Sequence, residues 1–159
     1  MKILYVGDPH VVPEELGDCE ALLQHVLDTA QARGIGTVCF LGDQTHNHAL
    51  LHVAVLDFWR RWFRAFKQAG IRVIAMVGNH DRPGTAGSEL HSMMVFEDLC
   101  EVVARPTMID GLLFVPYMES GDEFIAACRA NPTRFAACHN TFDGARYENG
   151  IYALSLIHI

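Results

Sequence analysis

Three apolar segments of this chain share one layout, and that layout constrains the fold more than any other feature. Each segment has the length and β-branched or aromatic content of a buried strand, and each ends in a glycine followed by polar side chains. Polar groups are therefore expected where three buried strands reach solvent. The segments and their turns are Ile3–Val6 before Gly7-Asp8-Pro9-His10, Val38–Leu41 before Gly42-Asp43-Gln44-Thr45-His46, and Ile71–Val77 before Gly78-Asn79-His80-Asp81.

Helical periodicity separates the three segments. Apolar residues at three- and four-residue spacing predict helices over 18–33 and 49–69, each followed by a glycine, and the two tryptophans of the second helix are expected in the core. Strands alternating with helices indicate an α/β fold built from right-handed βαβ units, with a parallel sheet. Ligands of such sheets collect at the carboxyl ends of the strands. All three polar turns are expected on that edge.

The pattern changes after residue 88. A short helix is expected over 89–99, and the short apolar runs 101–103, 107–109 and 112–116 predict a second, partly antiparallel sheet. A helix over 119–130 and a strand over 135–138 follow. This last strand leads into His139, which begins a fourth polar turn.

Composition limits the classes to which the protein can belong. With 159 residues, 50% of them hydrophobic, one globular domain with a sizeable core is expected. No apolar stretch approaches the length of about 18 residues that a membrane span needs, so a cytoplasmic protein without membrane association is expected. The five scattered cysteines disfavour a disulfide framework. The formal charge of -7 disfavours a stand-alone nucleic-acid-binding domain, but bound cations and a partner protein would offset it.

The side chains of the four turns are those that bind divalent metal ions. Carboxylate, imidazole and amide oxygen, without a suitably spaced thiolate, form a mixed donor set suited to Mn, Fe or Zn. If Asp43 bridges two ions, with Asp8 and His10 on one and Asn79 and His139 on the other, the ions lie about 3.5 to 4 Å apart and suit in-line attack on phosphorus. Each residue alone could instead cap its turn. The coincidence of four such turns favours the metal site.

The histidines near these ligands differ in their expected roles. The side chain of His80 points away from that of its neighbour if the turn is extended, which leaves it free to protonate a leaving oxygen. His46 is either a second catalytic or phosphate-contacting imidazole or a helix-entry cap. His48, His52 and His91 are expected at the surface or in packing.

Asp81 completes the third turn. It is expected either to hold its own turn or to pair with Arg82, and no catalytic role is assigned to it.

Taken in order, the four turns resemble the pattern of the calcineurin-like metallophosphoesterases. That pattern is Asp-x-His, Gly-Asp, Gly-Asn-His-Asp/Glu, a lone His and a final Gly-His-x-His. Within this superfamily, a histidine three residues after the bridging Asp, here His46 after Asp43, resembles the pattern of the SbcD-type DNA repair nucleases. The stretch 139–150 resembles phage-encoded members of that group. The first four parts of the pattern are matched by Asp8-Pro9-His10, Gly42-Asp43, Gly78-Asn79-His80-Asp81 and His139.

The resemblance implies a calcineurin-like four-layer α/β/β/α sandwich that cleaves DNA phosphodiesters, as exonuclease or endonuclease, in repair and recombination. It implies two divalent ions, with Mn expected before Fe or Zn. The implied partners are DNA and an SbcC-type ATPase that grips it, and a homodimer is an open alternative. His80, with His46 nearby, is the implied catalytic pair. The implied metal ligands are Asp8, His10, Asp43, Asn79 and His139.

The final Gly-His-x-His of the pattern is absent. Residues 1–153 are therefore expected to form a partial metallophosphoesterase domain that is incomplete at the C-terminus. Its metal affinity is expected to be weakened, and its activity reduced or lost. Residues 154–159 resemble the translation of a transposase end sequence used in preparing DNA libraries, so a non-native tail is expected and His158 is excluded as a ligand. The alternative is a genuine terminal strand over 151–159.

Two other functions remain open at this point. The acidic balance mildly favours a calcineurin-like phosphodiesterase or phosphatase that acts on a small molecule or a phosphoprotein. A non-catalytic metal-binding scaffold is the third reading.

Overall fold

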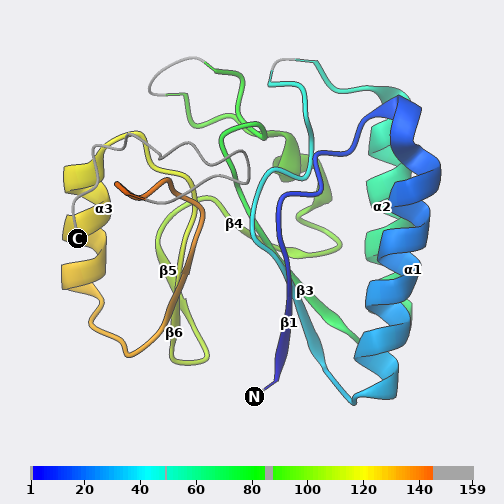
Figure 1. Ribbon diagram of the computed structural model, residues 1–159, viewed down its shortest axis with the longest axis horizontal. Helices are drawn as coiled ribbons and strands as arrows, with labels where there is room; N and C mark the ends of the chain where they lie inside the picture. Colours follow the sequence, from blue (N-terminus) through cyan, green and yellow to red (C-terminus); the bar gives the residue numbers. More distant parts are fainter. Residues whose placement is uncertain (1, 49, 85–87, 145–159) are drawn as a thin grey trace.

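The chain is arranged in four layers, in the order helix, sheet, sheet, helix (Figure 1). The computed structural model describes residues 2–48, 50–84 and 88–144. The α/β/β/α architecture expected from the sequence is confirmed. Expectations for residues 145–159, including the tail over 154–159, lie outside the described residues.

The first sheet is parallel throughout and holds β1 (Ile3–Val6), β2 (Thr37–Phe40), β3 (Arg72–Met76) and β4 (Glu101–Val103) in that order. Alternate residues face opposite sides, as the pleat requires: Phe40 packs in the helix-side core and Cys39 between the two sheets. The prediction that residues 101–103 join the second sheet was wrong. A run of three residues carries too little pattern to select its partner, and the alignment of Val103 with Met76 is set by packing between distant segments.

Two long helices cover the outer face of the first sheet. α1 (Leu16–Ala32) follows a short 3-10 turn, η1 (Pro13–Glu15), and α2 (Val53–Gln68) lies beside it. The second helix begins later than the sequence predicted, because His52 is extended, with φ −70° and ψ 133°. Both tryptophans of this helix, Trp59 and Trp62, are buried as predicted, together with Phe58, Phe63 and Phe66.

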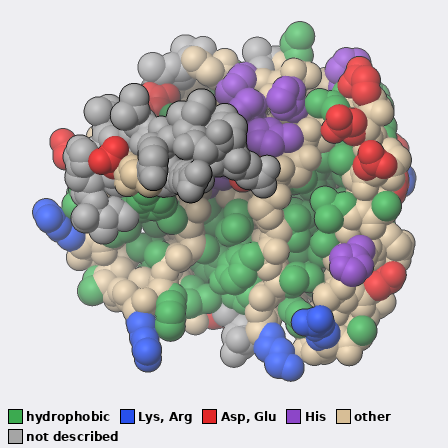
Figure 2. All heavy atoms as spheres, in the orientation of Figure 1, with side chains coloured by type: hydrophobic (Ala, Val, Ile, Leu, Met, Phe, Trp, Pro, Cys, Tyr) green, Lys and Arg blue, Asp and Glu red, His purple; other side chains and the backbone are tan. Residues whose placement is uncertain are grey.

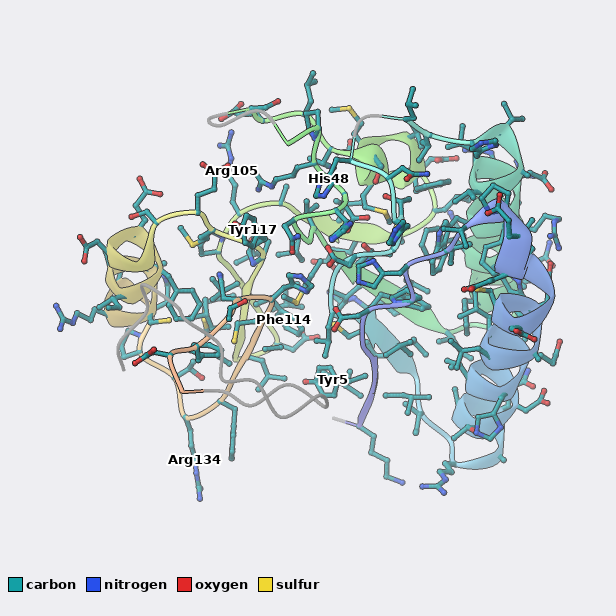
Figure 3. All side chains as sticks on the ribbon, turned by 45° about the horizontal axis from the view of Figure 1, so that its top comes forward. Tyr5, His48, Arg105, Phe114, Tyr117 and Arg134 are labelled. Carbon is teal, nitrogen blue, oxygen red and sulfur yellow. The ribbon has the colours of Figure 1, made fainter. Side chains whose placement is uncertain are left out.

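The second sheet is smaller and mixed. The hairpin of β5 (Thr107–Ile109) and β6 (Leu112–Val115) is antiparallel, and β7 (Ala136–Cys138) runs parallel to β6. Phe114 fills the space between the two sheets (Figure 3), while Leu113 packs toward α3 (Gly121–Ala130) on the outer face.

The connection between β3 and β4 differs from the sequence prediction. A helix was expected over 89–99, but the structure forms a short 3-10 helix there, η2 (Ser92–Phe96). Met93 and Phe96 are buried and account for the apolar spacing that suggested a longer helix.

The fold brings the ends of four strands to one edge. The turns after β1, β2 and β3 meet there because the first sheet is parallel, and β7 delivers His139 to the same edge from the second sheet. Among the described residues, no helix is both long and apolar enough to cross a membrane.

Candidate metal centre

Asp43, which follows β2, is the side chain around which the candidate ligands gather. Its carboxylate is only 6% exposed. Oδ1 accepts a hydrogen bond from the backbone N–H of His80 at 2.9 Å, and Oδ2 lies 3.4 Å from Nε2 of His10 and 3.4 Å from Nε2 of His139. One carboxylate oxygen between two imidazole nitrogens is a donor arrangement suited to a divalent cation.

His139 reaches this point from the second sheet. Its Nδ1 lies 2.9 Å from the carbonyl oxygen of Leu41 and 3.4 Å from Oδ1 of Asp8, and its Nε2 lies 3.2 Å from Oδ1 of Asn79. Donation from Nδ1 to the Leu41 carbonyl leaves the Nε2 lone pair facing the Asp43 and Asn79 oxygens. A backbone carbonyl that holds the other ring nitrogen is the usual support of a metal-binding histidine.

The potential ligand atoms fall into two groups. The first joins carboxylates to an imidazole and the second contains three imidazoles, and within each group the ligand atoms lie within 4.8 Å of one another. These groups do not assign residues to ions, so the prediction that Asp8 and His10 bind one ion and Asn79 and His139 the other stays a prediction. The donor chemistry of the first group fits a divalent metal ion, and in the second group His10 is the expected metal ligand. The groups are Asp8, Asp43 and His139, and His10, His46 and His80.

Three of the candidate ligands have a left-handed backbone. The φ angles are 38° at Asp8, 43° at His10 and 53° at Asp43, a region that costs a residue with a Cβ about 1 to 2 kcal/mol. The backbone N–H of His10 donates to the Asp43 carbonyl at 2.9 Å and helps to hold the two turns together. Strain of this kind concentrates at functional sites.

Two glycines allow the turns to approach one another. A Cβ at residue 78 would overlap Oδ1 and the backbone nitrogen of Asp43, and a Cβ at residue 42 would overlap the ring of His139. Gly42 also has φ +120°, which side chains rarely adopt. The glycines of these two turns are therefore required by the packing of the ligands against them.

Asp81 is 1% exposed and supports the ligand-bearing turns through hydrogen bonds. Its carboxylate accepts hydrogen bonds from the backbone N–H of Gly78 at 3.0 Å, the backbone N–H of Thr45 at 3.0 Å and the Thr45 hydroxyl at 3.1 Å. Of the two roles expected from the sequence, it therefore holds its own turn, and it also ties that turn to the turn after β2.

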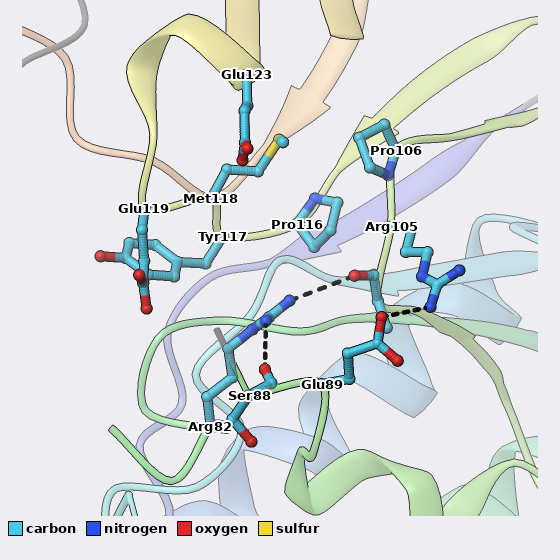
Figure 4. Close-up of a pocket in the computed structure, with 11 residues that line it drawn as sticks. Arg82, Ser88, Glu89, Arg105, Pro106, Pro116, Tyr117, Met118, Glu119 and Glu123 are labelled. Carbon is cyan, nitrogen blue, oxygen red and sulfur yellow. Dashed lines mark hydrogen bonds and ion pairs between the residues drawn. The ribbon is translucent and has the colours of Figure 1, made fainter. Parts of the chain in front are cut away.

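Arg82 binds elsewhere. Its guanidinium donates to the carbonyl oxygens of Ser88 and Ala104, each at 3.3 Å, beside a pocket of about 230 Å³ (Figure 4). The same pocket is bordered by an ion pair between Arg105 and Glu89 at 2.8 Å. The arginine thus fastens the segment after the third turn to the end of β4.

The charges at the centre influence one another. Burial lowers the pKa of His139, but its contacts with Asp43 and Asp8 outweigh burial and leave that pKa raised. Burial raises the pKa of Asp43, but the same contact with His139 and the His80 N–H leave it lowered. The pKa of His10 is lowered by burial, against the opposing effect of Asp43. The structure therefore favours an ionised Asp43, as a metal-binding carboxylate requires.

A cluster of imidazoles lies beside these ligands. Nδ1 of His80 is 2.7 Å from the carbonyl oxygen of His46, the rings of His80 and His46 are stacked at 5.4 Å, and the ring of His10 meets that of His80 edge-on at 4.7 Å. In Figure 2 most histidine side chains on the visible face gather at this edge of the molecule.

His48 is exposed, as the sequence predicted, and it also lies in this cluster. Its ring stacks on His80 at 4.2 Å and 25°, and its Nδ1 lies 3.0 Å from the Asn79 carbonyl oxygen. The close spacing of two histidines after Asp43 was the signal in the sequence. His52 is exposed and His91 is buried, as surface or packing residues are expected to be.

Comparison with known proteins agrees with this geometry. The family model of the calcineurin-like phosphoesterases matches residues 1–154, whereas no curated protein gave a significant match. Members of this family are hydrolases that use divalent metals to cleave phosphoesters. The chain, with its metal-type ligands gathered at one sheet edge, belongs to the calcineurin-like phosphoesterase family.

Proposed function

We propose that this phosphoesterase is a DNA nuclease of SbcD type that acts in DNA repair and recombination with two divalent ions, preferably Mn. The observation that carries the proposal is the position of the Asp43 carboxylate between Nε2 of His10 and Nε2 of His139, at 3.4 Å from each. Asp8 and Asn79 supply the further oxygen ligands. Divalent ions bound there would draw charge from the phosphoryl oxygens and so lower the barrier to hydrolysis.

The imidazoles of the cluster supply the proton chemistry in this proposal. His80 donates to the leaving oxygen, because its Nδ1 is occupied by the His46 carbonyl and its Nε2 is left for substrate. The His46 ring, exposed and stacked at 5.4 Å, contacts the phosphate beside it. The second histidine supports a nuclease of SbcD type over other members of the family.

The charge of the chain supports a partner that grips the nucleic acid. The formal net charge is -7, and on the face shown in Figure 2 the lysines and arginines lie away from the edge where the histidines gather. A DNA duplex held at that edge needs phosphate contacts from elsewhere. We assign that role to an SbcC-type ATPase, and a second copy of this chain is the alternative source.

A cytoplasmic location is part of the same proposal. All five cysteines are free thiols, as expected in a reducing compartment. An enzyme that acts on chromosomal or phage DNA would work there.

The direct test is degradation of linear duplex DNA by the chain with Mn, with and without the ATPase partner, compared with His80→Ala and with chelator. We expect Mn-dependent degradation that falls by about a hundredfold or more in His80→Ala. His25→Ala, an exposed histidine on α1, is the matched control and should keep full activity.

Two results would replace the proposal. Hydrolysis of small phosphodiesters or phosphoproteins without DNA degradation would make the protein a phosphodiesterase or phosphatase, which its acidic charge favours. Tight metal binding with no hydrolysis of any phosphoester would make it a metal-binding scaffold.

A further inference from the structure

His48 makes the shortest of the ring contacts to His80 in the described part of the chain. The ring centroids are 4.2 Å apart with an interplanar angle of 25°, compared with 4.7 Å for the edge-on ring of His10 and 5.4 Å for His46. A stacked ring restricts the plane of its neighbour, which an edge contact does less well. His48 therefore has the geometry to hold the orientation of the His80 imidazole.

A second contact of His48 reaches the backbone just before His80. Nδ1 of His48 lies 3.0 Å from the carbonyl oxygen of Asn79, so a protonated Nδ1 donates to that peptide. The residue thus contacts both the ring of His80 and the peptide unit from which it emerges. Figure 3 shows His48 at the edge of the molecule formed by the turns after the strands.

The hydrogen bond of the His80 side chain does not by itself fix the plane of the ring. The contact between its Nδ1 and the His46 carbonyl oxygen, at 2.7 Å, sets a direction but allows the ring to rotate about the line joining the two atoms. Stacking against His48, whose ring lies nearer than those of His10 and His46, restricts that rotation most closely. The two contacts together fix where Nε2 of His80 points.

We propose that His48 is a positioning residue, which holds the plane of the His80 ring so that Nε2 faces the leaving oxygen of a bound phosphodiester. The inference rests on the proposed function, in which His80 is the acid. A proton donor that is misplaced by even about 1 Å can lose up to a hundredfold in rate. His48 itself touches no reacting atom.

The activity test compares two phosphodiesters that differ in their need for an acid. On DNA, we expect kcat of His48→Ala to fall about tenfold with KM changed less than about twofold. A p-nitrophenyl phosphodiester, whose leaving group needs no proton, should be cleaved at nearly the original rate. His48→Phe keeps a ring against His80 and should recover most of the loss, while His52→Ala, in the same connecting segment, should have no effect.

A double variant separates positioning from a general structural role. If His48 acts through His80, then His48→Ala lowers the rate no further in a His80→Ala background. Equal losses on both substrates, or a loss that persists in the double variant, would overturn the proposal.

A second measurement does not depend on turnover. In the metal-free chain labelled with ¹⁵N, the imidazole resonances of His80, assigned by their loss in His80→Ala, should shift in His48→Ala and move less in His48→Phe. Unchanged His80 resonances would overturn the proposal. If the unmodified chain hydrolyses no phosphodiester, the proposed function fails, and these resonances alone then decide whether His48 positions His80.

Discussion

At the scale of single residues, Gly78 shows how a turn can be constrained by its neighbour. No Cβ fits there, because it would overlap Oδ1 and the backbone nitrogen of Asp43. We expect Gly78→Ala to cost about 1 to 3 kcal/mol of unfolding free energy, as overpacking typically does, and to weaken Mn binding measured by calorimetry.

The control for this substitution is Gly17→Ala. Gly17 lies in α1, and a Cβ there meets nothing within 4 Å. Alanine there should therefore not lower the unfolding free energy and should leave Mn binding unchanged. Unaltered Mn affinity in Gly78→Ala would show that the position of Asp43 tolerates displacement.

The buried thiol of Cys39 is expected to lower the stability of the folded chain at alkaline pH. Burial between the two sheets raises the pKa of its thiol to about 12. The thiol of the unfolded chain ionises near pH 8.5, so above that pH the unfolded state has lost a proton that the folded state retains. The stability that Cys39 contributes is complete below about pH 8.5 and falls by about 1.4 kcal/mol per pH unit as the pH rises toward 12.

Urea unfolding under reducing conditions at pH 8, 9 and 10 measures this slope. Cys39→Ala should show a shallower decline than the unmodified chain, although it starts from a lower stability because a buried group has been removed. The residual slope is expected from the other thiols whose pKa is raised by burial, chiefly Cys100, whose pKa is raised to about 12 by burial and by nearby acidic residues. Parallel slopes would contradict the prediction.

At the scale of elements, α2 supports the metal centre through one hydrogen bond. Nε1 of Trp59 donates to the carbonyl oxygen of Gln44, at 3.1 Å, in the turn that carries Asp43. Trp62, one turn further along the helix, donates instead to Glu20 at 2.7 Å, away from the site. The two tryptophans thus belong to one buried stripe but hold different parts of the fold.

This difference predicts the outcome of two matched substitutions. Trp59→Phe and Trp62→Phe should each lower the unfolding free energy, by about 1 kcal/mol for the lost hydrogen bond and more for the lost volume. Only Trp59→Phe should also weaken Mn binding by calorimetry, because only that indole is bonded to the ligand-bearing turn. Equal effects of the two variants on Mn affinity would show that the helix acts through general packing.

How far the elements follow from the sequence depends on the range of the interactions that fix them. The strand and helix periods, and the glycine at the end of each strand, are local, so the three polar turns could be predicted. The pairing of Glu101–Val103 with β3 and the stacking of His48 on His80 depend on backbone paths between distant residues. The left-handed backbone at Asp8, His10 and Asp43 likewise depends on tertiary contacts, and no pattern of side chains in the sequence predicts it.

At the scale of the whole molecule, the candidate ligands come from both sheets. Asp8 and Asp43 follow strands of the first sheet, whereas His139 follows β7 of the second, and the three have ligand atoms within 4.8 Å of one another. A cation held by all three would join the two sheets at this edge. Metal binding is therefore expected to stabilise the packing of one sheet on the other.

Thermal unfolding with and without metal tests this expectation. A cation at 100 times its dissociation constant adds about 2.7 kcal/mol, which for a chain of this size raises Tm by about 5 to 10 °C. Mn should act more strongly than Mg, because Mg dehydrates reluctantly and usually keeps several of its waters, and chelator should reverse the shift. Asp43→Asn should abolish the shift, whereas His25→Ala should retain it. A shift that persists in Asp43→Asn would place the bound cation elsewhere, and the two sheets would then be joined by their apolar interface and by polar contacts such as the Arg72–Asp110 ion pair, without a contribution from the metal.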